Sequence, residues 1–171
     1  VAAGGAYVPA NRRRDGILSR YTIAENITLA SLGSVTDWNG LIQRGREARA
    51  ASELIASVDI RPARPSAVAE DLSGGNQQKV VLARWLQAGS RVFVLDQPTS
   101  GVDIGSRAQL YPRVRELVDD GAAVLLVTLD AEELIGLSDR VLVLYRGEVV
   151  ADLPRGDATI EGVLALSTSG G

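Results

Sequence analysis

The chain has 171 residues, of which 46% are hydrophobic and 23% are charged, and its formal net charge at neutral pH is -3. This composition is typical of a globular domain and excludes a disordered or collagen-like chain. Because the sequence contains neither cysteine nor histidine, it also excludes disulfide frameworks, zinc enzymes and Ser-His-Asp hydrolases.

The first 70 residues divide into an opening segment and a helical segment. Residues 1–20 are predicted to hold the end of a core strand and the loop after it, and residues 21–70 a small helical subdomain. Thr22 and Glu25 form a capping-box pattern at the start of that subdomain. The arginine run at 12–14 fits either a nucleic-acid patch or a solvated turn. With a net charge of -3, we expect no nucleic-acid partner.

Residues 71–90 carry the most informative motif and the helix predicted to follow it. The motif reads Asp71-Leu72-Ser73-Gly74-Gly75-Asn76-Gln77-Gln78-Lys79. Its two glycines let backbone N–H groups approach an anion, its serine adds a hydroxyl donor, and a helix start contributes partial positive charge. The segment is therefore predicted to receive a phosphate. An ordinary serine-capped helix would show the same pattern, so both interpretations stay open for this motif taken alone.

The remaining segment alternates short apolar runs with helical stretches, which predicts an α/β core over residues 91–171. Apolar runs lie at 92–95, 124–127 and 141–145, helices are expected near 105–120 and 131–137, and residues 148–150 are expected to return as a hairpin. Runs of β-branched residues without polar alternation are typical of strands buried on both faces of a parallel sheet. The predicted core is therefore a parallel sheet covered by helices.

Asp96 follows the apolar run 92–95, at the carboxyl end of a predicted buried strand. Ligands bind at this edge of open α/β sheets, and a carboxylate there commonly helps to hold a Mg²⁺ ion bound to nucleotide phosphates. A strand-ending aspartate that caps the turn before Pro98 is the alternative. The single lysine, Lys79, does not follow a glycine, so the sequence contains no G-x-x-x-x-G-K-[ST] phosphate loop.

Three segments in this order and spacing resemble the signature, Walker B and D-loop motifs of ABC transporter ATPases: LSGGNQQK at 72–79, VFVLDQPT at 92–99 and SGVD at 100–103. The residues YVP at 7–9, RRRDG at 12–16 and ENITL at 25–29 extend the resemblance to the second nucleotide-binding domain of sugar importers of the ribose, galactose and xylose type. The resemblance implies a partial P-loop NTPase-like layered core with parallel strands, and a helical subdomain that carries the signature.

The same resemblance implies ATP and Mg²⁺ as cofactors, and a partner nucleotide-binding domain and integral membrane permease subunits as partners. The activity it implies is ATP hydrolysis coupled to monosaccharide uptake. No apolar run approaches the ~20 residues of a membrane span, so we expect the chain to be cytoplasmic and peripheral to the inner face of the cell membrane.

Site residues are assigned only through the resemblance. It implies five nucleotide contacts and one metal ligand: Ser73, Gly74, Gly75, Gln77 and Asp103 for the nucleotide, and Asp96 for the metal. In the family, two such domains bind head to tail, and the signature of one contacts the γ-phosphate of ATP held by the other. The signature of this chain would thus act on ATP held by its partner, whereas Asp96 belongs to its own site.

Three positions depart from the family pattern. Gln97 stands in place of the general-base glutamate, Leu129 in place of the switch histidine, and Ala10 in place of the Q-loop glutamine. An amide can orient a water molecule but cannot take its proton. We therefore expect this chain's own site to be degenerate and the chain alone to be inactive. Neutral drift and a regulatory role are both open as reasons for Gln97 and Leu129.

Domains of this kind begin with a strand and a Walker A loop, so we expect the chain to be the part of a longer polypeptide from just before the Q-loop to the C-terminus. Two other functions stay open. One is a non-hydrolytic scaffold that closes the partner's site and docks the membrane subunits. The other is an ABC ATPase unrelated to transport. The resemblance of the YVP, RRRDG and ENITL segments to sugar importers argues against this second function.

Overall fold

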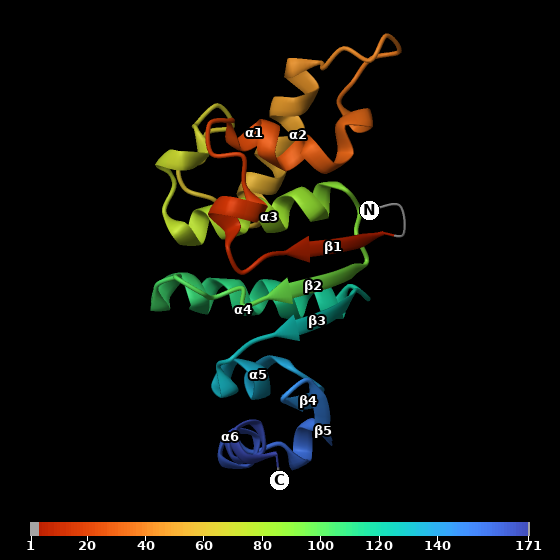
Figure 1. The fold of residues 1–171 in the computed structure, drawn as a ribbon. Coiled ribbons are helices and arrows are strands. Elements are labelled where there is room, and N and C mark those ends of the chain that lie inside the picture. Colours follow the sequence, from red (N-terminus) through yellow and green to blue (C-terminus); the bar gives the residue numbers. More distant parts are fainter. Residues whose placement is uncertain (1–3, 171) are drawn as a thin grey trace. The chain divides into compact units, whose positions relative to one another are not determined.

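The computed structural model describes residues 4–170 (Figure 1). The chain divides into two compact units, Val1–Leu125 and Leu126–Gly171. The segments that resemble the signature, Walker B and D-loop motifs all lie in the first unit. Their mutual geometry is therefore that of one compact body.

A three-stranded sheet with the order β1-β2-β3 is formed by Gly5–Val8, Val92–Asp96 and Ala123–Val127. β1 and β2 run parallel, with Ala6 opposite Phe93 and Val8 opposite Leu95, and all four side chains are buried. Parallel neighbours need a crossover connection, and here it contains helix α3 (Gly74–Gln87). The predicted α/β class is confirmed, as is the strand that ends at the carboxylate of the Walker B segment.

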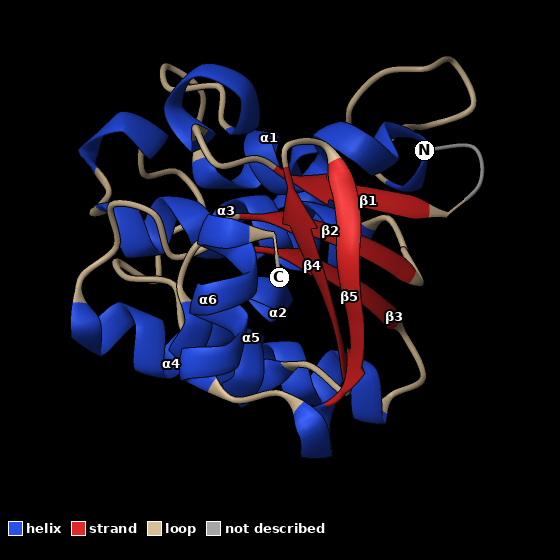
Figure 2. Cartoon of the chain, turned by 60° about the horizontal axis from the view of Figure 1, so that its bottom comes forward, coloured by secondary structure: helices blue, strands red, loops and turns tan. Residues whose placement is uncertain are grey.

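The connection from β1 to β2 is largely helical (Figure 2). Before α3 it contains η1 (Arg12–Gly16), α1 (Ile23–Thr28), η2 (Leu29–Ser34), α2 (Arg44–Ser57) and η3 (Ala69–Asp71). Both halves of the predicted capping box are present, because Thr22 Oγ1 accepts from Glu25 N at 3.2 Å and Glu25 Oε2 accepts from Thr22 N at 2.9 Å. Ile23 and Ile27 of α1 are fully buried, and α1 contacts both α2 and α3.

A buried polar network joins α3 to the start of the helical subdomain. The guanidinium of Arg84 donates from Nε to Asn26 O at 2.8 Å, from Nη1 to Gly16 O at 2.7 Å and from Nη2 to Asn26 Oδ1 at 3.0 Å. Asn26 in turn accepts from Leu18 N at 2.8 Å and donates to Leu18 O and Thr22 O, each at 3.0 Å. Burial lowers the pKa of Arg84. One arginine and one asparagine thus satisfy the backbone groups of the loop that enters α1.

Lys79 is the single lysine of the sequence, and it points inward. Its Nζ donates to Asp59 O and to Gln109 Oε1, each at 2.7 Å, which ties α3 to α4 (Ile104–Asp119). Burial lowers the pKa of the Lys79 ammonium. A lowered pKa raises the reactive neutral fraction, but a side chain that is 7% exposed must first open to meet a reagent.

We therefore expect an amine-selective acylating reagent to modify Lys79 at least ~10-fold more slowly in the native chain than in the urea-unfolded chain. The rate is read by mass spectrometry of the peptide that contains Lys79, so a reactive terminal amine does not interfere. Equal rates in the two states would contradict the buried position of this side chain.

The second unit contains a hairpin between two helices. Its elements are α5 (Ala131–Leu137), β4 (Arg140–Tyr145), β5 (Glu148–Pro154), η4 (Arg155–Asp157) and α6 (Ile160–Ser169). β4 and β5 pair antiparallel, which confirms the predicted return after Arg146 and Gly147. Both turn residues have positive φ, 50° and 87°, as a tight hairpin turn requires. The unit has its own core, formed by Val141, Val143, Ala158 and Val163.

Burial of the strand at 141–145 differs from the sequence prediction. Val141 and Val143 are buried, whereas Leu142 and Leu144 are exposed. β4 lies in an antiparallel hairpin that packs against α6, and such a hairpin, covered on one face, buries only every second side chain. The prediction of a parallel strand buried on both faces is therefore wrong for β4. The prediction also fails for β3, whose side chains are exposed or half-buried, and for β2, in which Phe93 and Leu95 are buried but Val92 is exposed.

Candidate functional site

The parallel pairing of β1 and β2 brings two distant loops to one edge of the sheet. Val8 lies opposite Leu95, so the loop after β1 and the loop after β2 leave the sheet side by side (Figure 1). This carboxyl edge is where open α/β sheets bind ligands. Asp96 ends β2 at this edge, and the segment of Ala10 follows β1 there.

The carboxylate of Asp96 accepts a hydrogen bond from the hydroxyl of Tyr7, with a Tyr7 Oη to Asp96 Oδ2 distance of 3.0 Å. Tyr7 lies opposite Val94 in the strand register, and Asp96 is two residues further along, on the same face of the sheet. The hydrogen bond to Asp96 raises the pKa of the Tyr7 phenol above its usual value. The phenol therefore reports the charge on the Asp96 carboxylate.

We expect the pKa of Tyr7 to lie above the ordinary value of ~10 and to fall when Asp96→Asn removes the carboxylate, because the phenolate would no longer face a negative charge. The measurement is a titration of tyrosine absorbance, in which Tyr7→Phe identifies the transition that belongs to this residue. An unchanged transition in Asp96→Asn would contradict the hydrogen bond.

Gln97 follows Asp96 and has a left-handed backbone, with a φ of 43°. A non-glycine residue in this region costs about 1–2 kcal/mol, and here the Gln97 carbonyl accepts from Ser100 N at 2.9 Å, which closes a turn. The side chain is half buried. The amide at this position can donate to and accept from a water molecule, but it has no basic group that could take a proton.

Leu129, the other predicted departure, lies in the second unit between β3 and α5 and is 87% exposed. Its neighbours are polar: Thr128 Oγ1 donates to Glu133 Oε2 at 2.6 Å, and Asp130 caps α5. The loop is thus held by its neighbours, while the leucine presents an apolar surface to solvent. It offers no hydrogen-bonding side chain.

Ser73 caps α3, as the motif predicts. Its Oγ accepts from Asn76 Nδ2 at 2.9 Å and from Asn76 N at 3.4 Å. Leu72 before the cap is buried, and most of the following helix is buried as well. The start of a 14-residue helix carries partial positive charge and favours an anion. The structure therefore contains the capped helix that both interpretations share.

Gln77 lies elsewhere than the resemblance implies. Its side chain is 2% exposed, and Nε2 donates to Ala69 O at 3.1 Å. It stands one turn after Ser73 on the buried face of α3, where it supports η3. In this conformation Gln77 stabilises the loop before the signature, and its burial gives the predicted nucleotide contact no support.

Asp103 is exposed and precedes α4. Its carbonyl accepts from Arg107 N at 3.0 Å, so the carbonyl belongs to the first turn of that helix. The carboxylate lies at the surface of the first unit. This position is compatible with the predicted contact to a nucleotide across an interface.

Arg12 is the residue that sequence analysis missed. Its guanidinium donates from Nη1 to Ser100 O at 2.8 Å and from Nη2 to Gly101 O at 3.0 Å. It lies against Gly74 as well. A cavity of about 330 Å³ opens beside this contact, lined by Ala10, Asn11, Arg12, Arg13, Ser100 and Gly101. The run of three arginines gave no sign that one of them bridges to loops about 90 residues away.

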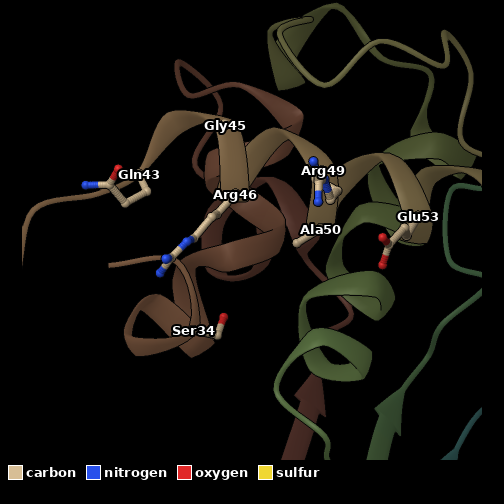
Figure 3. A pocket seen from close by; sticks show the side chains of 7 residues that line it. All are labelled: Ser34, Gln43, Gly45, Arg46, Arg49, Ala50 and Glu53. Atoms are coloured by element: carbon tan, nitrogen blue, oxygen red, sulfur yellow. The ribbon is translucent and has the colours of Figure 1, made fainter. Parts of the chain in front are cut away.

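A second hollow, of about 580 Å³, lies between η2 and α2 (Figure 3). It is lined in part by Ser34, Arg46, Arg49 and Glu53. Its two arginines share the wall with a carboxylate, and none of the predicted site residues lines it. The hollow is thus separate from the site at the sheet edge.

Two features are absent from the described part of the chain. Residues 4–170 contain no helix long and apolar enough to cross a bilayer. The same residues contain no group of three or more carboxylates that could hold a metal ion by themselves. A single carboxylate such as Asp96 suits Mg²⁺, which usually takes one or two protein carboxylates and completes its shell with phosphate and water.

Comparison with known proteins gives one consistent family. A family profile described as ABC transporter matches residues 4–100. The chain is 43% identical over 168 residues to ribose import ATP-binding protein RbsA 2 of Streptomyces avermitilis, covering 98% of this chain and 33% of that protein. It is 39% identical over 170 residues to ribose import ATP-binding protein RbsA of Bacillus subtilis, covering 99% of this chain and 34% of that protein. The chain thus spans about a third of the length of these relatives.

Solved structures show the same fold. A nucleotide-free ATP-binding cassette from an ABC transporter matches with a TM-score of 0.75 at 20% identity, over 96% of this chain and 66% of that chain. An ATP-binding cassette in an ADP conformation matches with a TM-score of 0.71 at 18% identity, over 98% of this chain and 66% of that chain. At these identities the likeness concerns the fold alone.

Proposed function

The chain belongs to the ABC transporter family, and from this membership we propose that it is part of the ATP-binding subunit of an importer that couples ATP hydrolysis to monosaccharide uptake. Its relatives in Streptomyces avermitilis and Bacillus subtilis carry the name ribose import ATP-binding protein. The partners would be a second nucleotide-binding domain and integral membrane permease subunits. The chain would then lie at the inner face of the cell membrane, held there by those subunits.

The observation that carries the proposal is the convergence of three sequence segments in the first unit. The Arg12 side chain donates to the carbonyls of Ser100 and Gly101 and lies against Gly74. A capped helix alone would explain Ser73, and a strand-ending turn alone would explain Asp96. Neither explains why the signature turn, residues 73–76, and the D-loop turn, residues 99–102, share one arginine at the ligand edge of the sheet.

In this proposal the start of α3 acts on ATP that the partner domain holds. Ser73 supplies a hydroxyl, and Gly74 and Gly75 supply backbone donors at the positive end of the helix. Asp103, exposed at the start of α4, would contact nucleotide across the same interface. When bound, ATP supplies the reacting γ-phosphoryl group, and the role of this chain is to position and neutralise it.

The chain's own site would work differently. Asp96 would hold Mg²⁺, which supplies charge neutralisation on the phosphates, and Gln97 would orient a water molecule without taking its proton. Gln97 and Leu129 therefore support a site that does not hydrolyse ATP by itself, and we propose that this chain alone is inactive. In this proposal the non-hydrolytic scaffold role applies only to the chain's own nucleotide site, and not to the signature segment that acts on the partner's ATP.

Nucleic acid is not part of the proposal. Arg12 is engaged by carbonyl groups, and Arg14 pairs with Asp15 at 2.9 Å. The arginine run therefore does not form a free basic patch of three side chains.

The test is Gly75→Asp in the parent protein, assembled with its permease subunits in vesicles. We expect ATP turnover and sugar uptake to fall at least ~10-fold, equal to about 1.4 kcal/mol of lost transition-state stabilisation, because a carboxylate would repel and crowd the partner's γ-phosphate. Gly75 is buried, so assembly and melting temperature are measured first, and Gly75→Ala serves as the milder variant.

Gly45→Asp is the matched control, because Gly45 also lies in the first turn of a helix and has open space where a side chain would be. It should leave both rates unchanged. If the Gly75 variants assemble and both rates stay at the native level, the segment is only a capped helix and the proposed function fails.

A further inference from the structure

Arg12 occupies the junction of three loops. It is the first residue of η1, directly after the loop that leaves β1. From there its side chain reaches the turn after β2, where the two Nη atoms donate to the successive carbonyls of Ser100 and Gly101 at 2.8 and 3.0 Å. A planar guanidinium can make two parallel hydrogen bonds of this kind, whereas a lysine ammonium acts as a point charge.

The same guanidinium lies against the signature turn. A Cβ added at Gly74 would lie 2.3 Å from Arg12 Nη2 and 3.1 Å from Gly101 O. Any side chain at Gly74 must therefore displace Arg12, the D-loop turn or both. The glycine at this position lets three backbone segments meet at one guanidinium.

The contacts of Arg12 described above are to backbone groups and include no carboxylate. Burial lowers the pKa of Arg12, and the neighbouring Arg13 lowers it further. Its Nε is buried and has no hydrogen-bond partner in the described part of the chain. The Arg12 cation is thus held by two carbonyls beside the start of α3.

We propose that Arg12 is a positioning residue that fixes the D-loop turn against the signature turn, so that the two present one rigid surface to the partner domain and its ATP. The proposal rests on the proposed function for its role in turnover, but the bridge itself is a property of the first unit. Arg12 touches neither nucleotide nor metal in this account. It acts through Ser100, Gly101 and Gly74.

Hydrogen exchange of the chain tests the bridge without nucleotide. We expect Arg12→Ala to raise the exchange rates of backbone amides in 99–102 and in 74–76 together, by at least ~10-fold, because both turns lose the same contact. Arg12→Lys should raise these exchange rates too, since one ammonium cannot replace the two parallel hydrogen bonds of the guanidinium. Gly74→Ala, which displaces the guanidinium and keeps its charge, should have the same effect. Arg13→Ala removes an adjacent exposed arginine and should leave both turns unchanged.

Turnover tests the positioning role. In the parent transporter, Arg12→Ala is expected to lower kcat at least ~10-fold while KM for ATP changes less than ~2-fold, because no nucleotide contact is lost. Millimolar guanidinium should restore part of kcat in Arg12→Ala and none in Gly74→Ala, where the space is filled. A stability effect alone would give neither this kcat and KM pattern nor the selective rescue.

The outcomes separate the two proposals. Unchanged exchange in both turns of Arg12→Ala overturns the bridge, whatever Gly75→Asp does to turnover. Faster exchange with native kcat overturns the positioning role. Faster exchange in Arg12→Ala together with native turnover in Gly75→Asp contradicts the proposed function and leaves the bridge in place.

Discussion

Replacing Asn26 by alanine is expected to lower the free energy of unfolding by ~3 kcal/mol, because it strands several buried groups at once. Asn26 is fully buried. Its side chain accepts from Leu18 N and from Arg84 Nη2, and it donates to Leu18 O and Thr22 O. Each buried polar group left without a partner costs ~1–3 kcal/mol, and relaxation with water entry recovers part of the sum.

Urea unfolding of Asn26→Ala measures this loss, with Asn39→Ala as the control. Asn39 is exposed in the loop between η2 and α2, so the same chemical change there should stay within ~0.5 kcal/mol. A loss below ~1 kcal/mol at Asn26 would mean that the network contributes little beyond what water supplies.

Phe93→Ala is expected to destabilise the first unit by ~3–5 kcal/mol. Phe93 is among the largest side chains that are fully buried, and it lies opposite Ala6 in the β1 and β2 register. Alanine would remove the ring and leave a cavity. The backbone hydrogen bonds between β1 and β2 hold the strands in place, so the surrounding residues can fill that cavity only in part.

The matched control is Val92→Ala on the same strand, since Val92 is 46% exposed and should lose less than ~1 kcal/mol. Both free energies of unfolding come from urea titrations that follow far-ultraviolet circular dichroism. Equal losses at the two positions would contradict the register, because Phe93 and Val92 lie on opposite faces of the sheet.

Local rules predicted the parts of the fold that a short stretch of sequence determines. The run before Asp96 forms a strand because its apolar and β-branched residues suit a parallel sheet, and its Phe93 and Leu95 side chains are buried. Thr22 and Ser73 cap their helices because their side chains satisfy amide groups only three residues away. Each of these interactions lies within one element and its cap.

Long-range contacts could not be predicted in the same way. Gln77 faces inward because η3 provides a carbonyl for its amide, and no local rule places that carbonyl there. The hydrogen bond between Tyr7 and Asp96 follows from the register of β1 and β2, and the sequence does not determine that register. Arg12 looked like one of three exposed arginines, and its position at three loops is set by tertiary packing. The strand at 141–145 was misjudged because its pairing with β5, and not its composition, decides which side chains are covered.

Ser73, Gly74 and Gly75 are proposed to act only on ATP that a second domain holds, so nucleotide binding is the most direct measurement. Calorimetry with Mg-ATP should give a Kd weaker than ~1 mM for residues 1–171 alone, since a helix terminus contributes only ~0.3–1 kcal/mol to anion binding. With a domain of the parent assembly that carries a phosphate loop, a nonhydrolysable Mg-ATP analogue should drive association, and Gly75→Asp should abolish it. A low-micromolar Kd, ~10 µM or tighter, for the chain alone would contradict this account, as would association with the partner that Gly75→Asp leaves unchanged.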